Sequence, residues 1–355
     1  MRTLIIAAGL AVAAGLAAPT AVSTAAEPVS MTLPAPTGPY PVGTRELHLV
    51  DHDRTDPWTG EPRELMVSVW YPAVRDGTRA PQFPSAVAAF YDLHAGVAPG
   101  TADFAGTLTH SRSGAGRLPG RWPVILYSPG GGHSRFLGTT LVEDLASRGY
   151  VVVGMDHTPA SPVQFPDRFE APRPGVDAAV VMRERVRDTS FVLDELHITE
   201  AGMVGHSMGG FTTAEAMLTE PRIAAGVNLD GSMDPRYGQA AVHGVTRPFL
   251  LLGGGLSSGV PHNHAHSDDW ASFWSASTGW RRDVYVPTAE HLSFTDAQVL
   301  LPQLDGDFTA SIGTIAPERS LAVQRKYLAA FFDLHLRGRP TTVFDHPAYP
   351  EVELI

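Results

Sequence analysis

The pattern Gly-x-Ser-x-Gly, which places a serine on a sharp turn between a strand and a helix, occurs twice in this chain. One match is centred on Ser207 (GHSMG) and the other on Ser257 (GLSSG). Glycine supplies 35 of the 355 residues, so roughly 0.1–0.3 matches are expected by chance. The flanking residues therefore have to decide which serine, if either, is a nucleophile.

The flanking residues favour Ser207. An apolar strand-like run, AGMVG, precedes it, and a helix-competent segment follows it and stops at Pro221. The N-terminus of that helix would point free N–H groups at a developing negative charge. After Ser257 the chain reads GVPHNH, which cannot begin a helix. We therefore predict that Ser207 is the nucleophile and that Ser257 lies in a glycine-rich loop.

A serine hydroxyl needs a base to remove its proton, and the chain has 15 histidines. His291 directly follows the predicted strand 283–287 and precedes another predicted helix, which fits the chain order serine, acid, histidine. His206 lies inside the turn with its side chain directed away from that of Ser207, and His133 lies in a glycine loop. We predict that His291 is the base.

Three other histidines, His262, His264 and His266, alternate in a polar loop. On an extended segment their side chains would share a face and would be able to bind a metal ion. No further ligand group is evident nearby, so a solvated loop is the preferred interpretation and we expect neither a metal nor a cofactor.

The acid that orients the histidine is predicted to be Asp230, which closes the predicted strand 223–229. Many hydrolases place this acid after the next strand, here PFLLLGG, whose nearest acid is Asp268. Asp268 is therefore the alternative. Asp156 ends an earlier strand and is predicted to shape the site instead.

Two backbone N–H groups are predicted to bind the oxyanion. One belongs to Met208, directly after the nucleophile. The other is assigned to Gly131 in the loop SPGGGH, where glycines let the backbone approach a substrate. The alternative interpretation of this loop is a plain tight turn.

The elements that position these residues form an α/β pattern. From Arg121 onward, short apolar runs alternate with longer amphipathic stretches, which predicts a mostly parallel sheet with helices on both faces. Strands are predicted at 123–128, 150–155, 201–205, 223–229, 248–254 and 283–287, and helices near 137–147, 176–196, 208–219 and 319–336. The apolar residues of 176–196 recur at helical spacing, giving that helix one face to bury.

The earlier part of the chain has a different pattern. Segments 44–50 and 65–71 are predicted to form an antiparallel edge pair, and a Pro/Gly-rich lead before them is predicted to lie extended on the surface. Residues 81–120, with a short helix near 85–95, are predicted to form a cap near the site or a surface insertion. No linker divides residues 27–355, so we predict a single domain.

Composition narrows the location and the partners. A net charge of -11 without a basic cluster argues against nucleic-acid binding. The first 26 residues combine Arg2 with an apolar run and small residues up to Ala26, which predicts a cleaved signal peptide and export, with an uncleaved membrane anchor as the alternative. The absence of cysteine excludes thiol nucleophiles and thiolate metal sites.

With these positions assembled, the chain resembles the secreted type II platelet-activating factor acetylhydrolase family of α/β-hydrolases. The similarity runs from LHLVDHDRTDPWTGEPRELMVSVWYPA through YSPGGG, YVVVGMDHTPAS, GHSMGG, NLDGSM and AEHLSF to the last helix. The resemblance implies a catalytic triad at Ser207, Asp230 and His291 and oxyanion donors at Gly131 and Met208. Pro129 and Met208 depart from residues frequent in the family, so its acetyl-phospholipid specificity is not carried over.

The prediction is a secreted serine carboxylester hydrolase that cleaves lipid or small esters through an acyl-enzyme on Ser207, with transient contact to a lipid or polymer surface. A cutinase-like polyester hydrolase or triacylglycerol lipase is the alternative, since their turns also often read GHSMGG. An enzyme acting on lactones or amides, and a catalytically silent secreted binding protein with the same fold, are further alternatives.

Overall fold

The computed structural model describes residues 27–355, so the predicted signal peptide lies outside the described residues. An eleven-stranded sheet has the strand order β15-β14-β11-β10-β9-β5-β6-β2-β1-β4-β3. Its strands are β1 (Val42–Thr55), β2 (Pro62–Pro72), β3 (Thr78–Pro81), β4 (Leu108–Ser113), β5 (Val124–Ser128), β6 (Val151–Met155), β9 (Ala201–His206), β10 (Ile223–Leu229), β11 (Phe249–Gly254), β14 (Arg281–Val286) and β15 (Glu353–Leu354). Two small hairpins, β7–β8 (Val163–Gln164, Phe169–Glu170) and β12–β13 (Leu256–Ser257, Val260–Pro261), lie outside it.

Strands β14, β11, β10, β9, β5 and β6 are mutually parallel and form the centre of the sheet. The helices are α1 (Ser85–His94), α2 (Thr139–Ser147), α3 (Ala178–Glu195), α4 (Met208–Thr219), α5 (Ala240–His243), α6 (Asp268–Ala276), α7 (Ala297–Leu300), α8 (Thr309–Ile312) and α9 (Pro317–Arg337), with 3-10 turns η1 (Arg135–Gly138), η2 (His291–Phe294) and η3 (Leu301–Gln303). No helix within residues 27–355 has the length and apolar character needed to cross a membrane.

The parallel strands are apolar throughout because each one faces two cores. Alternate residues point to opposite faces of a strand, so Ile125 of β5 packs in the core with α2 and α9, while its neighbour Leu126 packs in the core with α3, α4 and α6. Leu250 and Leu251 of β11 divide in the same way. This two-sided burial confirms the predicted parallel sheet with helices on both faces.

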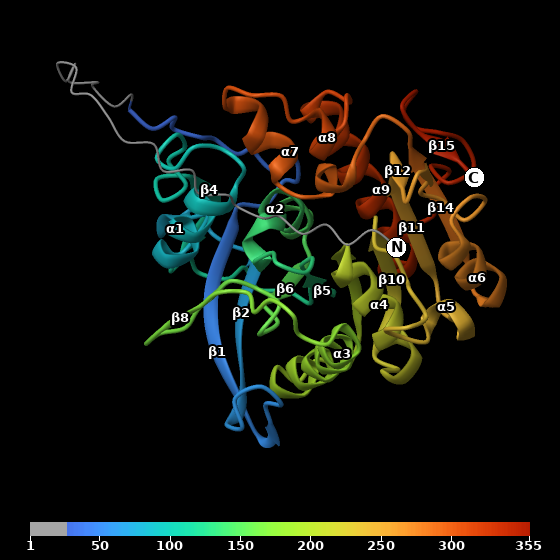
Figure 1. Ribbon diagram of the computed structural model, residues 1–355, viewed down its shortest axis with the longest axis horizontal. Coiled ribbons are helices and arrows are strands. Elements are labelled where there is room, and N and C mark those ends of the chain that lie inside the picture. The colour runs from blue at the N-terminus through green and yellow to red at the C-terminus, as the bar shows by residue number, and fades with distance from the viewer. Residues whose placement is uncertain (1–26) are drawn as a thin grey trace, which may run out of the picture.

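The antiparallel pair of β1 and β2 was predicted correctly, but its placement at the sheet edge was wrong. β2 lies between β1 and β6, and β4 and β3 continue the sheet beyond β1. Figure 1 shows this end, with β4 and α1 in cyan, opposite β15 and the C-terminus in red. Ser68 and Trp70 of β2 are both buried, as expected for a strand inside the sheet.

Residues 81–120 lie at this end of the sheet and supply α1 and β4. The short helix predicted near 85–95 is present as α1. Its Tyr91 hydroxyl accepts a hydrogen bond of 2.9 Å from the backbone N–H of Ser134, directly after the glycine loop. The segment therefore extends the sheet and contacts the base of the predicted oxyanion loop.

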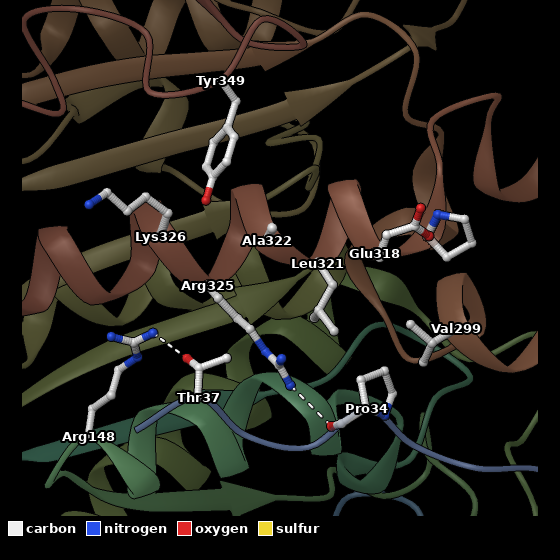
Figure 2. Close-up of a pocket in the computed structure, with 11 residues that line it drawn as sticks. Pro34, Thr37, Arg148, Val299, Glu318, Leu321, Ala322, Arg325, Lys326 and Tyr349 are labelled. Atoms are coloured by element: carbon white, nitrogen blue, oxygen red, sulfur yellow. Dashed lines mark hydrogen bonds between the residues drawn. The ribbon is translucent and has the colours of Figure 1, made fainter. Parts of the chain in front are cut away.

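The Pro/Gly-rich lead is extended, as predicted, but it is also anchored. Met31 and Leu33 are buried in the core. Figure 2 shows a groove between the lead and α9, in which Arg325 donates a hydrogen bond to the Pro34 carbonyl and Arg148 donates one to Thr37. The lead is thus held to α2 and α9 by apolar burial and by arginine side chains.

Candidate active site

Ser207 occupies the sharp turn between β9 and α4. Its backbone adopts φ 54° and ψ −123°, a conformation that costs a residue other than glycine about 1–3 kcal/mol. The Ser207 N–H donates to the Leu229 carbonyl at 2.8 Å, and its own carbonyl accepts from the N–H of Gly210 at 2.9 Å. These bonds hold Ser207 at the carboxyl edge of the parallel strands.

The turn requires glycine at positions 209 and 210, because the backbone there contacts two neighbouring segments. A Cβ on Gly209 would lie 1.9 Å from the Ser128 carbonyl oxygen, and one on Gly210 would lie 1.9 Å from the Asn228 side-chain oxygen. Both distances are far inside van der Waals contact. Any side chain at these positions would push α4 away from the loop after β5 and from the end of β10.

Asp230 and His291 are directly hydrogen-bonded. Asp230 follows β10, and His291 begins η2 after β14. The His291 Nδ1 donates to Asp230 Oδ2 at 2.6 Å. Asp230 is buried, whereas the His291 side chain is 48% exposed. The alternative acid, Asp268, begins α6 and is exposed, and the histidine's carboxylate partner in the described residues is Asp230.

The charge on Asp230 is stabilised inside the protein. Burial alone would raise the pKa of this carboxyl, but hydrogen bonds from His262 and His291 outweigh burial and lower the pKa to about 2. Asp230 is therefore ionised at neutral pH. An ionised carboxylate fixes the His291 proton on Nδ1 and leaves Nε2 able to accept a proton.

The backbone N–H groups of Gly131 and Met208 have the availability that an oxyanion site requires. The N–H of the next residue, Gly132, donates to the Ala160 carbonyl at 2.6 Å, but neither the Gly131 nor the Met208 N–H donates to a protein group among residues 27–355. A Cβ built on Gly131 would lie 3.5–3.9 Å from three atoms of the Met208 side chain. The two donors thus belong to adjoining segments.

Comparison with known proteins places this arrangement in a family. The family model described as "Platelet-activating factor acetylhydrolase, isoform II" matches residues 103–170 and 176–341, about two thirds of the chain. The chain belongs to this family. It is a carboxylic ester hydrolase with an α/β-hydrolase fold.

Three relatives support the assignment. A "Probable 1-alkyl-2-acetylglycerophosphocholine esterase" of Arthroderma benhamiae is 29% identical over 92% of this chain and 94% of its own length. The "Platelet-activating factor acetylhydrolase" of Gallus gallus is 20% identical over 64% of this chain and 65% of its own. A solved structure, "Ferulic acid esterase from Streptomyces cinnamoneus", is 36% identical with a TM-score of 0.80 and covers 92% of this chain and 99% of that one.

In this esterase, His206 has a contact that sequence reasoning missed. Its side chain is fully buried, and its Nε2 donates to the backbone carbonyl of His291 at 3.0 Å. Its ring lies 4.6 Å from the His291 ring and parallel to the ring of His133 at 5.7 Å. His206 therefore holds the loop that carries the predicted base, while Ser207, the next residue, is the predicted nucleophile.

A series of buried, hydrogen-bonded polar side chains contacts the first residues of the predicted oxyanion loop. Arg185 of α3 donates to Ser128 Oγ at 3.0 Å and also to the Pro129 carbonyl. Ser128 Oγ lies 3.0 Å from His157 Nε2, and His157 Nδ1 donates to Asp188 at 2.9 Å. All four side chains are fully buried. The first loop residues are thereby tied to helix α3.

These hydrogen bonds were not predicted from the sequence, because the side chains that form them come from three segments that are distant in the sequence. Asp188 is balanced by Arg63, which donates to both of its carboxylate oxygens at 2.7–3.0 Å. Burial would raise the pKa of Asp188, but the Arg63 charge holds it well below its usual range. Asp156, predicted to shape the site, accepts a hydrogen bond of 2.5 Å from the N–H of Arg135 in η1.

The three alternating histidines do not share a face. His262 donates to Asp230, His264 to Asp283, both at 2.7 Å, and His266 bonds to the Asn263 side chain at 2.8 Å. No cluster of three or more potential metal ligands occurs within residues 27–355. Each of the three side chains therefore has a different partner. The interpretation as a wholly solvated loop is wrong, because His262 is buried. Ser257 lies in the β12–β13 hairpin with no helix after it, as predicted.

The buried histidines predict a stability that falls with acid. Burial lowers the pKa of His157 to about 3 and that of His206 well below its ordinary value. The unfolded chain binds protons on these rings near pH 6.5 whereas the folded chain does not. The free energy of unfolding should therefore fall as pH drops below about 6.5, by up to about 1.4 kcal/mol per pH unit for each ring. Denaturant unfolding across this range measures the slope.

The matched variants are His157→Asn and His346→Gln. Asparagine retains a donor toward Asp188 but does not titrate, so its slope should be shallower than that of the wild type. His346 is exposed, and its replacement should leave the slope unchanged. Equal slopes in all three proteins would contradict a buried neutral His157.

Proposed function

We propose that this esterase is secreted and works through an acyl-enzyme on Ser207. His291 Nε2 removes the Ser207 hydroxyl proton as Ser207 Oγ attacks the carbonyl carbon of the ester. The π electrons of the carbonyl bond move onto the carbonyl oxygen, which becomes an oxyanion. The N–H groups of Gly131 and Met208 stabilise that oxyanion. When the tetrahedral intermediate collapses, the C–O bond to the alcohol breaks and His291 returns the proton to the leaving alkoxide.

The second half uses water in place of the alcohol. His291 removes a proton from water as the hydroxide attacks the acyl carbonyl, and the proton then goes to Ser207 Oγ as the acid leaves. Asp230 stays ionised throughout and stabilises the imidazolium. The observation that carries the proposal is the 2.6 Å bond from His291 to Asp230, next to a strained turn that presents Ser207.

Secretion is supported by the residue pattern of the first 26 positions. The expected mature protein begins at Glu27. N-terminal sequencing of the protein recovered from culture medium tests this, and a full-length chain retained in the cell fraction would contradict it.

The surroundings of the triad favour an ester with a short acyl group and a polar alcohol. Gly131 and His291 are exposed, so the site opens directly to solvent. A cavity of about 620 Å³ lies beside the turn that follows Asp230 and is lined mostly by polar side chains, among them Ser232, Asp234 and Asp269. A polar cavity suits a hydroxylated or charged leaving group better than a long alkyl chain. The activity named for one relative, on an acetylglycerophosphocholine, combines a short acyl group with a polar alcohol, whereas the acid released by a ferulic acid esterase is aromatic and larger.

Two serines in identical patterns provide a direct test. Ser207→Ala should lower kcat for p-nitrophenyl acetate by at least roughly 10³-fold, because the attacking oxygen is removed. Ser257→Ala should retain kcat for p-nitrophenyl acetate within about twofold, because Ser257 is not the attacking nucleophile. An organophosphonate should modify only the tryptic peptide that contains Ser207, as read by mass spectrometry. Near wild-type turnover by Ser207→Ala would refute the mechanism.

A panel of substrates tests the ester class. For p-nitrophenyl esters from acetate to palmitate, kcat/KM should be highest for the short acyl groups and at least roughly tenfold lower for palmitate. The cavity beside the turn after Asp230 is lined mostly by polar side chains, so it would stabilise a long alkyl chain little. Methyl ferulate, a short-chain phospholipid, a polyester film and an anilide analogue complete the panel. Highest activity on palmitate or on the film would favour a lipase or a polyester hydrolase, and preference for the anilide would favour an amidase.

A further inference from the structure

Two histidines share the carboxylate of Asp230. His291 Nδ1 donates to Oδ2 at 2.6 Å, and His262 Nδ1 lies 2.7 Å from Oδ1. The backbone N–H of Gly254 donates to the same Oδ1 at 2.9 Å. One oxygen is therefore held by two donors, and the other is directed at His291. The proposed mechanism uses only the second oxygen, so the donors on the first need an explanation.

His262 is held tightly in place. It is 1% exposed, and its ring lies 4.2 Å from the ring of Trp270. The Trp270 indole N–H donates to the Gly231 carbonyl at 2.9 Å, which ties this wall to the residue after Asp230. A Cβ on Gly253 would lie 2.0 Å from the His262 carbonyl oxygen, so β11 and the His262 backbone pack in direct contact. This packing fixes the His262 ring against the carboxylate.

The bond to Asp230 is the polar contact of the His262 side chain. Its Nε2 is buried and has no hydrogen-bond partner within residues 27–355. A ring that only filled space would not need nitrogen, and burying an unpartnered polar atom costs free energy. That cost is offset by the charge-assisted bond that Nδ1 makes with Asp230. The hydrogen-bonding nitrogen of His262 therefore serves the proposed catalytic acid, Asp230.

We propose that His262 is a positioning residue for ester hydrolysis, whose Nδ1–H orients Asp230 so that Oδ2 faces His291. With the Oδ1 lone pairs engaged, the carboxylate cannot rotate away from His291 as the imidazolium forms. Five other titratable groups face this pair. They are Asp283, bonded to His264, Glu290, which precedes His291, and the side chains of Tyr285, His133 and His206, the last with its ring 4.6 Å from that of His291. None of them bonds to the Asp230 carboxylate. The inference rests on the proposed role of Asp230.

The test compares two replacements of His262. Leucine removes the donor, and we expect kcat to fall roughly 10–100-fold, the range for loss of a hydrogen bond to a charged group, with KM unchanged within about twofold. Asparagine places an amide N–H near the position of Nδ1 and should restore kcat to within about fivefold of wild type. His264→Asn, in the same loop but bonded to Asp283, should leave kcat unchanged and serves as the control.

The pH profile separates positioning from packing. The His262 donor lowers the pKa of Asp230, so without it the carboxylate binds a proton more tightly. The acidic limb of kcat/KM should therefore move to higher pH in His262→Leu and return toward wild type in His262→Asn. Equal loss of kcat in both variants with an unmoved acidic limb would overturn the inference, because a packing role alone predicts that result.

A measurement on the wild type protects the test if His262→Leu does not fold. In protein labelled with ¹⁵N-histidine, ring N–H protons bonded to carboxylates should resonate downfield, and those of His157, His262, His264 and His291 are candidates. His262→Asn should remove one of these signals and leave the others, and a spectrum from which it removes none would overturn the inference. If Ser207→Ala remains active, the proposed triad itself fails. If Ser207→Ala is inactive and His262→Leu is as fast as wild type, only the role of His262 fails.

Discussion

Close backbone contact around the turn at Ser207 is the constraint on which the site depends. The glycines after the serine let α4 touch the Ser128 carbonyl on one side and the Asn228 side chain on the other. Gly231 adds a third contact, since a Cβ there would lie 2.1 Å from the Ser207 carbonyl oxygen. Three segments that are distant in sequence therefore meet at one point. The proposed nucleophile, oxyanion donors and acid are neighbours because no side chain separates their backbones.

Two residues at this meeting point have strained backbone conformations. Ser207 and Asp230 are two of the four residues other than glycine with positive φ among residues 27–355. Each conformation costs free energy that the surrounding packing has to offset. The parallel sheet provides that packing, because its strands are buried on both faces and hold the turns at their carboxyl ends. The predicted oxyanion loop is held separately, through the hydrogen bond from Arg185 to Ser128. A site held in this way needs little rearrangement as charge develops.

The sequence predicted local features well and non-local ones poorly. The bounds predicted for α4 and β10 match those observed because an apolar run, a glycine turn and a proline stop are all signals within a few residues. The β1–β2 pair was wrongly placed at the edge of the sheet. The sheet continues beyond β1 through β4, and β4 comes from a segment without strand-like periodicity. His262 was missed for a similar reason. Its partner is 32 positions earlier in the chain, and no spacing rule connects a loop histidine to such an acid.

The β12–β13 hairpin, described above as the place of Ser257, is clamped at its base. Gly254 on one side and His262 on the other both donate to Asp230, while Leu256 and Val260 at its tip are exposed. The two ends of the hairpin are thus hydrogen-bonded to the same carboxylate. Substitutions at the exposed tip leave both donors in place. Insertions or deletions between Gly254 and His262 would shift His262, and the proposed orientation of Asp230 toward His291 would be lost with it.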